Sequence, residues 1–387
     1  MKVLAFTSIR SDYDLLTPLY KLLHKDSDID FRLLVSGAHL STDYGLSVEE
    51  IRQDGFNVLM EIETLINSDS KKSKIKTASL LLQNSIDVVD NFNPDLIIIV
   101  GDREDVIMAS LVGLYLQIPI IHFFGGDHEV AGHEDTVIRH ATSKIANLHF
   151  VASEEHKQRL IKMGEDKKRI FNVGNVALDK FFNYKHIDIY KILKVFSDNF
   201  DETKKIALVI YHPSPNGEEN KIGDTVLENI INAIMDANMI AFISSPNTDH
   251  GNKKIIQAMN KFKNNPNVVF FKNLDRNQFL SVFTQCEFII GNSSAGIIEA
   301  ATIKKAAINV GERQKGRMCS KNVVFCSITK EDISNAIKKV CSVSFQKSIK
   351  SIVNPYGDGH SANKVYKLIK TLNFKDYLLK IEDPLND

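Results

Sequence analysis

Short apolar runs alternate with amphipathic stretches along most of the chain. In the first 150 residues the clearest apolar run, Leu96–Val100, contains only Leu, Ile and Val. Continuous apolar runs of strand length are typical of parallel strands that are buried on both faces. We therefore expect strands at Val3–Thr7, Phe31–Ser36, Leu96–Val100, Ile118–Phe123 and Leu148–Ala152, and helices at Asp14–His24, Ser73–Phe92, Glu104–Leu116, Asp135–Ala146 and Glu154–Met163.

The same alternation restarts after a polar stretch between Asn175 and Lys205. The strands expected there are Ile206–Tyr211, Met239–Ser244, Val268–Phe271, Phe288–Ile290 and Ala306–Val310, and Lys364–Leu372 is expected to form a final helix. The fold class is therefore α/β, with two Rossmann-like, doubly wound parallel-sheet domains facing a central cleft. The expected boundaries are residues 1–175 for the first domain, 176–204 for a linker, 205–365 for the second domain and 366–387 for a tail that packs back on the first.

Composition excludes several classes of partner. Lys and Arg together number 48, as do Asp and Glu, so the formal net charge of the 387 residues is zero. This balance argues against broad attraction to nucleic acid or to an anionic membrane. The four cysteines form no Cys-x-x-Cys pair, which favours reduced thiols over a disulfide framework or zinc site. No apolar run reaches the length of a signal peptide core or a membrane span, so we expect a cytoplasmic protein.

The stretch IIGNSSAGIIEAA, from Ile289 to Ala301, predicts a buried strand that turns directly into a helix. The start of a helix has free N–H groups and a partial positive charge, and it therefore favours phosphate. A carboxylate one turn further can accept hydrogen bonds from a ribose diol. An ordinary capped helix with a surface glutamate is the alternative. The candidate binding residues are Asn292, Ser293, Ser294, Gly296 and Glu299.

Polar side chains also follow two strands of the first domain. Arg10 comes after the first strand, where its planar guanidinium suits an oxyanion. Asp102 and Arg103 follow Gly101 at the end of the central strand. A solvated arginine and a helix-capping aspartate are the alternative interpretations.

The densest group of titratable residues is HFFGGDHEVAGHEDTVIRHA, from His122 to Ala141. So many titratable groups beside a glycine pair favour a site at which protons move. The candidates are Asp127, Glu129, Asp135 and Arg139. A metal centre at His128 and His133 is an alternative, but no compact ligand motif supports it.

The second domain places further candidates after its strands. His212 follows the first strand and is expected to contact phosphate or act as a general acid. Asn247 and Lys272 follow the next two strands, and Arg313 lies on a basic loop bounded by glycines. Capping, packing and solvation are the alternative roles of these residues.

In this order, the loops resemble the UDP-N-acetylglucosamine 2-epimerase family, and more closely its hydrolysing branch. The resemblance extends from SIRSDYDLL to NPYGDG and includes GDREDVIMA, SPNTDHGN and INVGERQKGR. It implies the two-domain arrangement of glycosyltransferase B enzymes, with the nucleotide bound mainly by the second domain. Many relatives have Glu or His at the position of Phe124, so Asp127 or Glu129 is expected to replace that group.

Carried over residue by residue, the resemblance implies that Arg10 and His212 contact the diphosphate. It likewise implies that Ser293 and Ser294 cradle phosphate and that Glu299 binds the ribose. Asp102, Asp135 and Arg139 match the polar residues that surround the sugar in this family.

The resemblance also implies a reaction without metal or cofactor. A UDP-sugar loses UDP to give a 2-acetamidoglucal, and water then adds to yield N-acetylmannosamine. The same reaction on a 2,4-diacetamido sugar, a non-hydrolysing epimerase and a glycosyltransferase are the alternatives. A non-enzymatic nucleotide-sugar sensor would lack the carboxylates. Family members commonly form homodimers or higher assemblies, and helices of the first domain are the expected contact.

Overall fold

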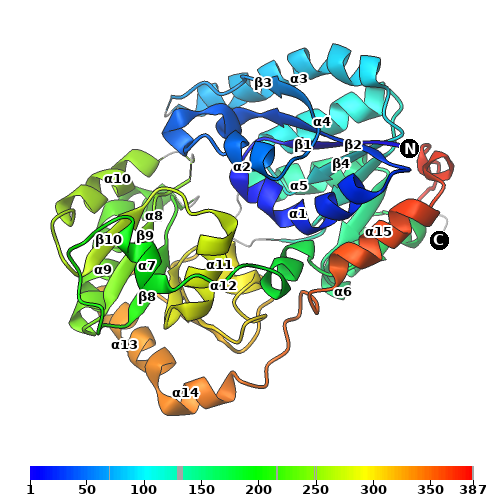
Figure 1. The fold of residues 1–387 in the computed structure, drawn as a ribbon. Helices are drawn as coiled ribbons and strands as arrows, with labels where there is room; N and C mark the ends of the chain where they lie inside the picture. Colours follow the sequence, from blue (N-terminus) through cyan, green and yellow to red (C-terminus); the bar gives the residue numbers. More distant parts are fainter. Residues whose placement is uncertain (69, 129–133, 215–216, 248, 250, 386–387) are drawn as a thin grey trace. The chain divides into compact units, whose positions relative to one another are not determined.

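The computed structural model describes residues 1–68, 70–128, 134–214, 217–247, 249 and 251–385. The chain divides into two compact units, each with its own sheet (Figure 1). Unit 1 comprises residues 1–128 and 134–180 together with the C-terminal segment 356–387, and residues 181–355 belong to unit 2. The last part of the chain therefore returns to the unit with which the chain begins.

Within the described residues, unit 1 is built on a seven-stranded sheet with the order β3-β2-β1-β4-β5-β6-β7, and all of these strand pairs are parallel. The strands are β1 Lys2–Thr7, β2 Asp30–Ser36, β3 Val58–Ile62, β4 Leu96–Val100, β5 Ile120–Phe123, β6 Leu148–Val151 and β7 Ile170–Asn172. The helices are α1 Arg10–Lys25, α2 Val48–Gln53, α3 Lys71–Phe92, α4 Glu104–Tyr115, α5 Glu134–Ile145, α6 Glu154–Lys162 and α15 Ser361–Thr371.

Helices cover both faces of this sheet, which explains the apolar run of its central strand. Successive side chains of a strand point to opposite faces. Ile97 and Ile99 of β4 pack with α3 and α4, whereas Ile98 and Val100 pack with α1 and α15. Every residue of β4 is buried, which explains why all five are apolar.

The C-terminal tail closes the end of α5. Lys380 Nζ donates to the carbonyl oxygens of Lys144 and Ala146, both at 3.0 Å, and lies 2.6 Å from the buried carboxylate of Glu165. Arg169 donates to the carbonyl oxygen of Tyr377 at 2.7 Å. The last carbonyl groups of a helix have no partner within the helix, so a lysine at this place satisfies and stabilises that end.

The described part of unit 2 contains a six-stranded parallel sheet with the order β10-β9-β8-β11-β12-β13. The strands are β8 Ile206–Ile210, β9 Ile240–Ser244, β10 Val268–Phe271, β11 Phe288–Gly291, β12 Ala306–Val310 and β13 Val323–Cys326. The helices are α7 Ile189–Lys194, α8 Gly217–Lys221, α9 Gly223–Asp236, α10 Asn252–Lys261, α11 Arg276–Gln285, α12 Ser294–Ile298, α13 Lys330–Cys341 and α14 Val343–Ser348.

This second sheet is also covered on both faces. Leu208 and Phe242 pack with α7 and α11 on one side, and Val209 and Ile243 pack with α9 and α13 on the other. The predicted fold class, two doubly wound parallel α/β units, is confirmed. In the part of the chain that the structure describes, no helix is both long and apolar enough to cross a membrane.

Candidate active site

Each sheet reverses its strand order at one point, and the predicted residues lie beside that point. In unit 1 the order reverses between β1 and β4, and in unit 2 between β8 and β11. Arg10 begins the helix after β1, and Asp102 follows β4. His212 follows β8, and Asn292 follows β11. Doubly wound sheets bind ligands at such points, because loops diverge there beyond the carboxyl ends of the strands.

In unit 1 a buried arginine connects two carboxylates from different loops. Arg139 on α5 is 3% exposed, and its Nη2 donates to Asp102 Oδ2. Its Nη1 lies 3.9 Å from Asp127 Oδ2. The guanidinium is planar and always charged, so it orients both carboxylates and compensates for their removal from water. The structure thus brings together three residues that the sequence predicted separately.

Asp127 makes further contacts with its own loop and with α6. Its Oδ1 accepts a hydrogen bond from the backbone N–H of His128 at 2.8 Å and lies 3.5 Å from His156 Nε2. The rings of His128 and His140 stack with centroids 5.8 Å apart. Burial and the nearby charge of Arg139 lower the pKa of His140, so this group favours the neutral form.

The remaining candidates of unit 1 surround this cluster less closely. Asp135 lies one helical turn before Arg139 on α5 and is half-buried. Arg10 donates through Nε to Glu50 at 3.0 Å instead of joining the cluster. Arg103 caps the start of α4, with its Nε 3.9 Å from Asp105. Glu129 lies outside the described residues, as does His133.

Phe124 directly precedes the glycine pair Gly125 and Gly126. Its φ is +64°, which is uncommon for a residue other than glycine, and its ring packs edge-on against Phe123 with centroids 6.1 Å apart. The side chain packs against the apolar core of unit 1. Phe124 therefore offers no titratable group at this position, and Asp127 is the first carboxylate that follows it in the sequence.

Sequence reasoning did not single out two titratable residues close to the loop that carries Asp102. Asp105, in the first turn of α4, has a pKa raised to about 6 by burial and by Glu104. His122 on β5 is fully buried and contacts the loop that carries Asp102. His122 interrupts an otherwise apolar strand, and that interruption was the signal in the sequence.

In unit 2 the loops at the reversal point exchange hydrogen bonds. The backbone N–H of His212 donates to Asn292 Oδ1 at 2.8 Å, and Asn292 Nδ2 donates to the carbonyl oxygen of His212 at 2.9 Å. Asn292 is fully buried, so its amide is held by these contacts. The loops after β8 and β11 are thereby joined into one rigid platform.

The ring of His212 is neutral, and its proton position follows from its neighbour. The backbone N–H of Asn247 donates to His212 Nδ1 at 3.2 Å, so the ring proton resides on Nε2. Burial, together with Arg313, lowers the pKa of His212 from the usual 6.5 to about 3. His212 is therefore suited to donate a hydrogen bond through Nε2.

The basic loop after β12 closes on the same platform. Arg313 Nη1 and Gln314 Nε2 both donate to the carbonyl oxygen of Asn292, each at 3.1 Å. Arg317 donates in turn to Gln314 Oε1 at 2.7 Å. Gln314 is fully buried and was not among the predicted site residues. Lys272, by contrast, is exposed after β10.

The turn from β11 into α12 requires glycine at its first position. Gly291 has a φ of +139°, and a Cβ there would lie 2.0 Å from the carbonyl oxygen of Ile210. Ser293 caps α12 by accepting from the backbone N–H of Ala295, Ser294 begins the helix, and Glu299 caps its end with 8% exposure.

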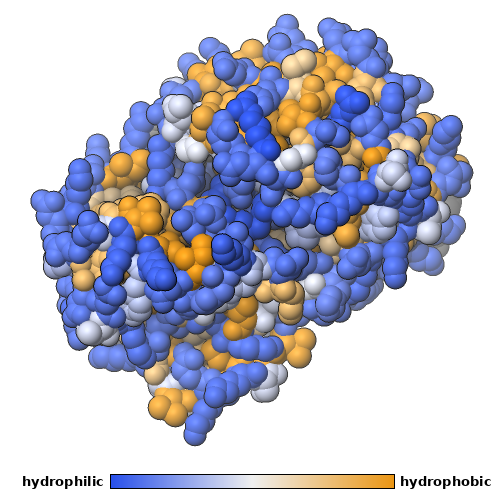
Figure 2. Space-filling model, in the orientation of Figure 1, coloured by the Kyte–Doolittle hydropathy of each residue, from blue (hydrophilic) through white to orange (hydrophobic). Residues whose placement is uncertain are grey.

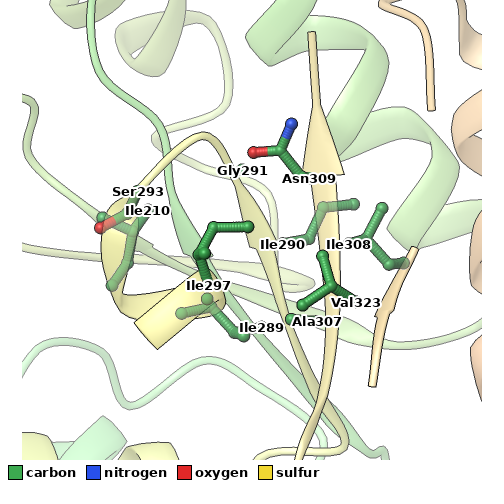
Figure 3. Close-up of a pocket in the computed structure, with 11 residues that line it drawn as sticks. Ile210, Ile289, Ile290, Gly291, Ser293, Ile297, Ala307, Ile308, Asn309 and Val323 are labelled. Carbon is green, nitrogen blue, oxygen red and sulfur yellow. The ribbon is translucent and has the colours of Figure 1, made fainter. Parts of the chain in front are cut away.

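A small cavity of about 10 Å³ lies beneath this turn (Figure 3). Its lining is mainly apolar, with isoleucines of β8, β11, β12 and α12 together with Ala307 and Val323. A Cβ on Gly296 would make only ordinary contacts with Ala307 and Ile289. The cavity is large enough for one water molecule at most, and a ligand must therefore bind above the turn.

Solved structures share this fold. UDP-N-acetylglucosamine 2-epimerase from Neisseria meningitidis, bound to UDP-GlcNAc, superposes with a TM-score of 0.80 at 18% identity, covering 96% of this chain and 100% of that one. A putative UDP-N-acetylglucosamine 2-epimerase from Listeria monocytogenes gives 0.77 at 18% identity, covering 96% of each chain. The fold is thus that of two-domain, glycosyltransferase-B-like proteins.

Sequence comparison defines the family. The model of the UDP-N-acetylglucosamine 2-epimerase family matches residues 21–370, and the chain belongs to this family. It is 34% identical to the UDP-N,N'-diacetylbacillosamine 2-epimerase (hydrolyzing) of Legionella pneumophila, over 98% of both chains. It is 32% identical to the GDP/UDP-N,N'-diacetylbacillosamine 2-epimerase (hydrolyzing) of Campylobacter jejuni, again over 98% of both. The polysialic acid biosynthesis protein P7 of Escherichia coli is 27% identical over 95% of this chain and 93% of its own.

The buried histidines predict a loss of stability in mild acid. The pKa of His122 and of His212 is about 3 in the folded chain, against 6.5 for an ordinary histidine. Below pH 6.5 the unfolded chain binds protons that the folded chain does not, so the free energy of unfolding falls as the pH falls toward 3. The slope is at most ~1.4 kcal/mol per pH unit for each histidine.

Asp105 acts in the opposite direction below pH 6, because its pKa is raised on folding, so a histidine variant is needed to isolate the contribution of His122. Thermal unfolding at pH 7.0 and pH 5.5 measures the effect. His122→Gln should show a smaller loss between these pH values than the wild type. An equal loss in both proteins would contradict this assignment.

Proposed function

We propose that this protein is a hydrolysing UDP-sugar 2-epimerase. The observation that carries the proposal is the cluster beyond the ends of β4 and β5, in which the buried Arg139 donates to Asp102 and lies 3.9 Å from Asp127. Carboxylates held in this way suit proton transfer at a sugar carbon. The names of two relatives that are more than 30% identical over nearly the whole chain support hydrolysis of the nucleotide bond. These acids favour proton chemistry at the sugar over simple transfer by a glycosyltransferase.

The proposed reaction has two stages. A carboxylate removes the proton from carbon 2 of the sugar, the electron pair forms a double bond to carbon 1, and the bond from carbon 1 to the diphosphate oxygen breaks. Water then adds its hydroxyl at carbon 1, while an acid returns a proton to the opposite face of carbon 2. Asp102, Asp127 and Asp135 are the proposed acids and bases, and Glu129 remains a candidate. Arg139 keeps the first two in place.

Unit 2 is proposed to bind the nucleotide and to stabilise the departing diphosphate. His212 offers a neutral Nε2–H donor, and Arg313 supplies a fixed positive charge beside it. Because burial lowers the pKa of His212 to about 3, we assign it hydrogen bonding rather than proton transfer. Ser293 and Ser294 would bind phosphate at the turn above the small cavity, and Arg10 would contribute a second cation.

The other predicted contacts extend from the diphosphate toward the nucleoside and the sugar. Glu299 is proposed to accept hydrogen bonds from the ribose, and Asn247 and Lys272 lie on the loops proposed to flank the nucleoside. Arg103 is proposed to contact the substrate from the unit 1 side. A cytoplasmic location remains a prediction.

The sequence analysis placed UDP-N-acetylglucosamine first among the possible substrates. The names of the relatives at 34% and 32% identity favour a sugar with acetamido groups at both carbon 2 and carbon 4, as in UDP-N,N'-diacetylbacillosamine. A relative named UDP-N-acetylglucosamine 2-epimerase is 26% identical over 88% of this chain. We therefore propose the diacetamido sugar as the preferred substrate.

Proton NMR in heavy water, with each of the two nucleotide sugars in turn, tests the function. The expected result is free UDP together with a 2-epimerised sugar that carries deuterium at carbon 2, formed faster from the diacetamido substrate. Return of intact UDP-sugar with deuterium at carbon 2 would indicate a non-hydrolysing epimerase. Deuterium-free product on an added acceptor would indicate a transferase.

Two substitutions should separate chemistry from binding. Asp102→Asn removes a proposed acid–base group, so kcat should fall by roughly 10²–10⁴. The Kd for UDP should stay within about twofold, because Asp102 lies in unit 1 and the nucleotide is assigned to unit 2. Glu299→Ala should instead weaken UDP binding by about 10-fold, the worth of a charge-assisted hydrogen bond.

Steady-state kinetics and calorimetric titration with UDP measure these effects. Asp87→Asn and Glu331→Ala are matched controls, since both side chains are exposed, on α3 and α13. Near-normal turnover in Asp102→Asn would remove Asp102 from the mechanism. Unchanged UDP affinity in Glu299→Ala would refute its role at the ribose.

We also propose that the protein forms a homo-oligomer through the outer face of α3, α4 and α5. Ile75 is 72% exposed on α3, Tyr115 is 81% exposed on α4, and Val137 is 66% exposed on α5. Apolar residues gather over the region in which Figure 1 draws β3, α3 and α4 (Figure 2). Several large apolar side chains on neighbouring helices are typical of a contact between subunits.

Light scattering coupled to size exclusion tests this contact. Ile75→Glu combined with Tyr115→Glu should convert the assembly to monomers, because the charges would be buried in the interface. Val353→Glu is the control, since Val353 is 81% exposed in unit 2. An oligomer that survives the double substitution places the contact elsewhere, and a monomeric wild type contradicts the proposal.

A further inference from the structure

One fully buried histidine in unit 1 has no role in the reaction described above. His122 lies in the centre of the sheet, on β5, beside Ile99 of β4 and His149 of β6. Its exposure is zero. A polar ring in such a place destabilises the fold unless its nitrogen atoms are hydrogen-bonded, so its contacts identify what it does.

Both ring nitrogens of His122 have partners, and these determine its protonation. Nε2 lies 2.8 Å from the carbonyl oxygen of Gly101. A carbonyl can only accept, so the ring proton is on Nε2, and Nδ1 accepts from the Ser143 hydroxyl at 3.1 Å. Burial lowers the pKa of His122 to about 3, and the ring is neutral at physiological pH.

The packing around this contact leaves no room for a larger residue. A Cβ at Gly125 would lie 2.7 Å from Ser143 Oγ and 3.1 Å from His122 Nδ1. Any side chain at Gly125 would collide with the two atoms that form this hydrogen bond. The hydrogen bond between His122 and Ser143 therefore explains why the first residue of the glycine pair is glycine.

The two ends of this contact lead to Asp102. Gly101, whose carbonyl accepts from His122, directly precedes Asp102 and has a φ of +90°. Ser143 lies four residues after Arg139 on α5, on the same face of the helix. Helix α5 is therefore connected to the loop after β4 in two ways. Ser143 of α5 contacts His122, which donates to the backbone of that loop at Gly101, and Arg139 of α5 donates to the Asp102 side chain.

We propose that His122, supported by Ser143, is a positioning residue that sets the direction of the Asp102 carboxylate. This inference rests on the proposed function, in which Asp102 transfers a proton. His122 itself has no exposed atom with which to touch substrate, so its effect on turnover passes through Asp102. Preorganised geometry of this kind changes kcat much more than nucleotide binding.

The test compares His122→Leu, which removes the donor, with His122→Gln, whose amide N–H can replace Nε2–H. His122→Leu should lower kcat by about 50-fold or more, with KM and the Kd for UDP within about threefold. His122→Gln should recover most of that loss. The shape of its pH–rate profile should match the wild type, because His122 does not titrate near neutral pH.

Two controls separate positioning from general stability. His149→Leu removes an equally buried histidine of the neighbouring strand, whose Nε2 hydrogen bond goes to Glu165 at 2.9 Å rather than to the Asp102 loop. Ser143→Ala removes the hydroxyl that donates to His122 Nδ1. Its control is Ser110→Ala, because Ser110 is a fully buried serine on α4 that donates within its own helix. Both controls should lower the melting temperature without a matching loss of kcat in the folded protein.

A double-mutant cycle with Asp102→Asn separates the two proposals. If His122 acts through Asp102, adding His122→Leu to Asp102→Asn should lower kcat by less than about threefold further. Full additivity, or a His122→Leu enzyme with normal kcat, overturns the positioning role while leaving Asp102 in the mechanism. Normal turnover in Asp102→Asn alone overturns the proposed function instead. Should His122→Leu not fold, Ser143→Ala, which removes the hydroxyl that donates to His122 Nδ1, takes its place in the cycle.

Discussion

The candidate site of unit 1 depends on one interaction, the contact of the Arg139 guanidinium with Asp102 and Asp127. Two carboxylates withdrawn from water beside each other repel, and each loses hydration. A single buried cation compensates for both and connects the loops after β4 and β5. Removing one partner of such a buried pair typically destabilises a protein by about 3–5 kcal/mol. The same ion pairs therefore stabilise these loops and orient the proposed acids.

Unit 2 reaches comparable rigidity without an ion pair. Its centre is Asn292, whose side chain exchanges hydrogen bonds with His212 and whose carbonyl accepts from Arg313 and Gln314. The positive charge of Arg313 also acts on Glu219, where it opposes the effect of burial on the pKa of that carboxyl. The contrast fits the proposed division of labour, since proton transfer needs ionised acids and diphosphate binding needs fixed donors.

The central strands and the fold class could be predicted because their apolar runs record burial on both faces. The strands that sequence reasoning missed, β3, β7 and β13, all lie at sheet edges. Edge strands bury fewer side chains, and β3 accordingly has only Ile62 buried. Candidate residues such as Asp102 and Arg139 could be named from their loops. Their contact, across 37 residues of sequence, could not be predicted, because it depends on how α5 packs against the sheet. The importance of Gln314 and His122 was missed for a related reason. The role of a buried polar residue depends on its hydrogen-bond partners, and these are known only from the structure.

The return of the C-terminal tail to unit 1 has a consequence for biosynthesis. Lys380 closes the end of α5, and α15 covers one face of the first sheet, so both are needed to complete unit 1. These segments follow residues 181–355 in the chain, so the whole of unit 2 is synthesised before unit 1 has all of its parts. A nascent chain usually folds its N-terminal domain first, but here unit 1 can be completed only after unit 2 has been made. Arg139 on α5 therefore gains its full surroundings only once Lys380 has been added.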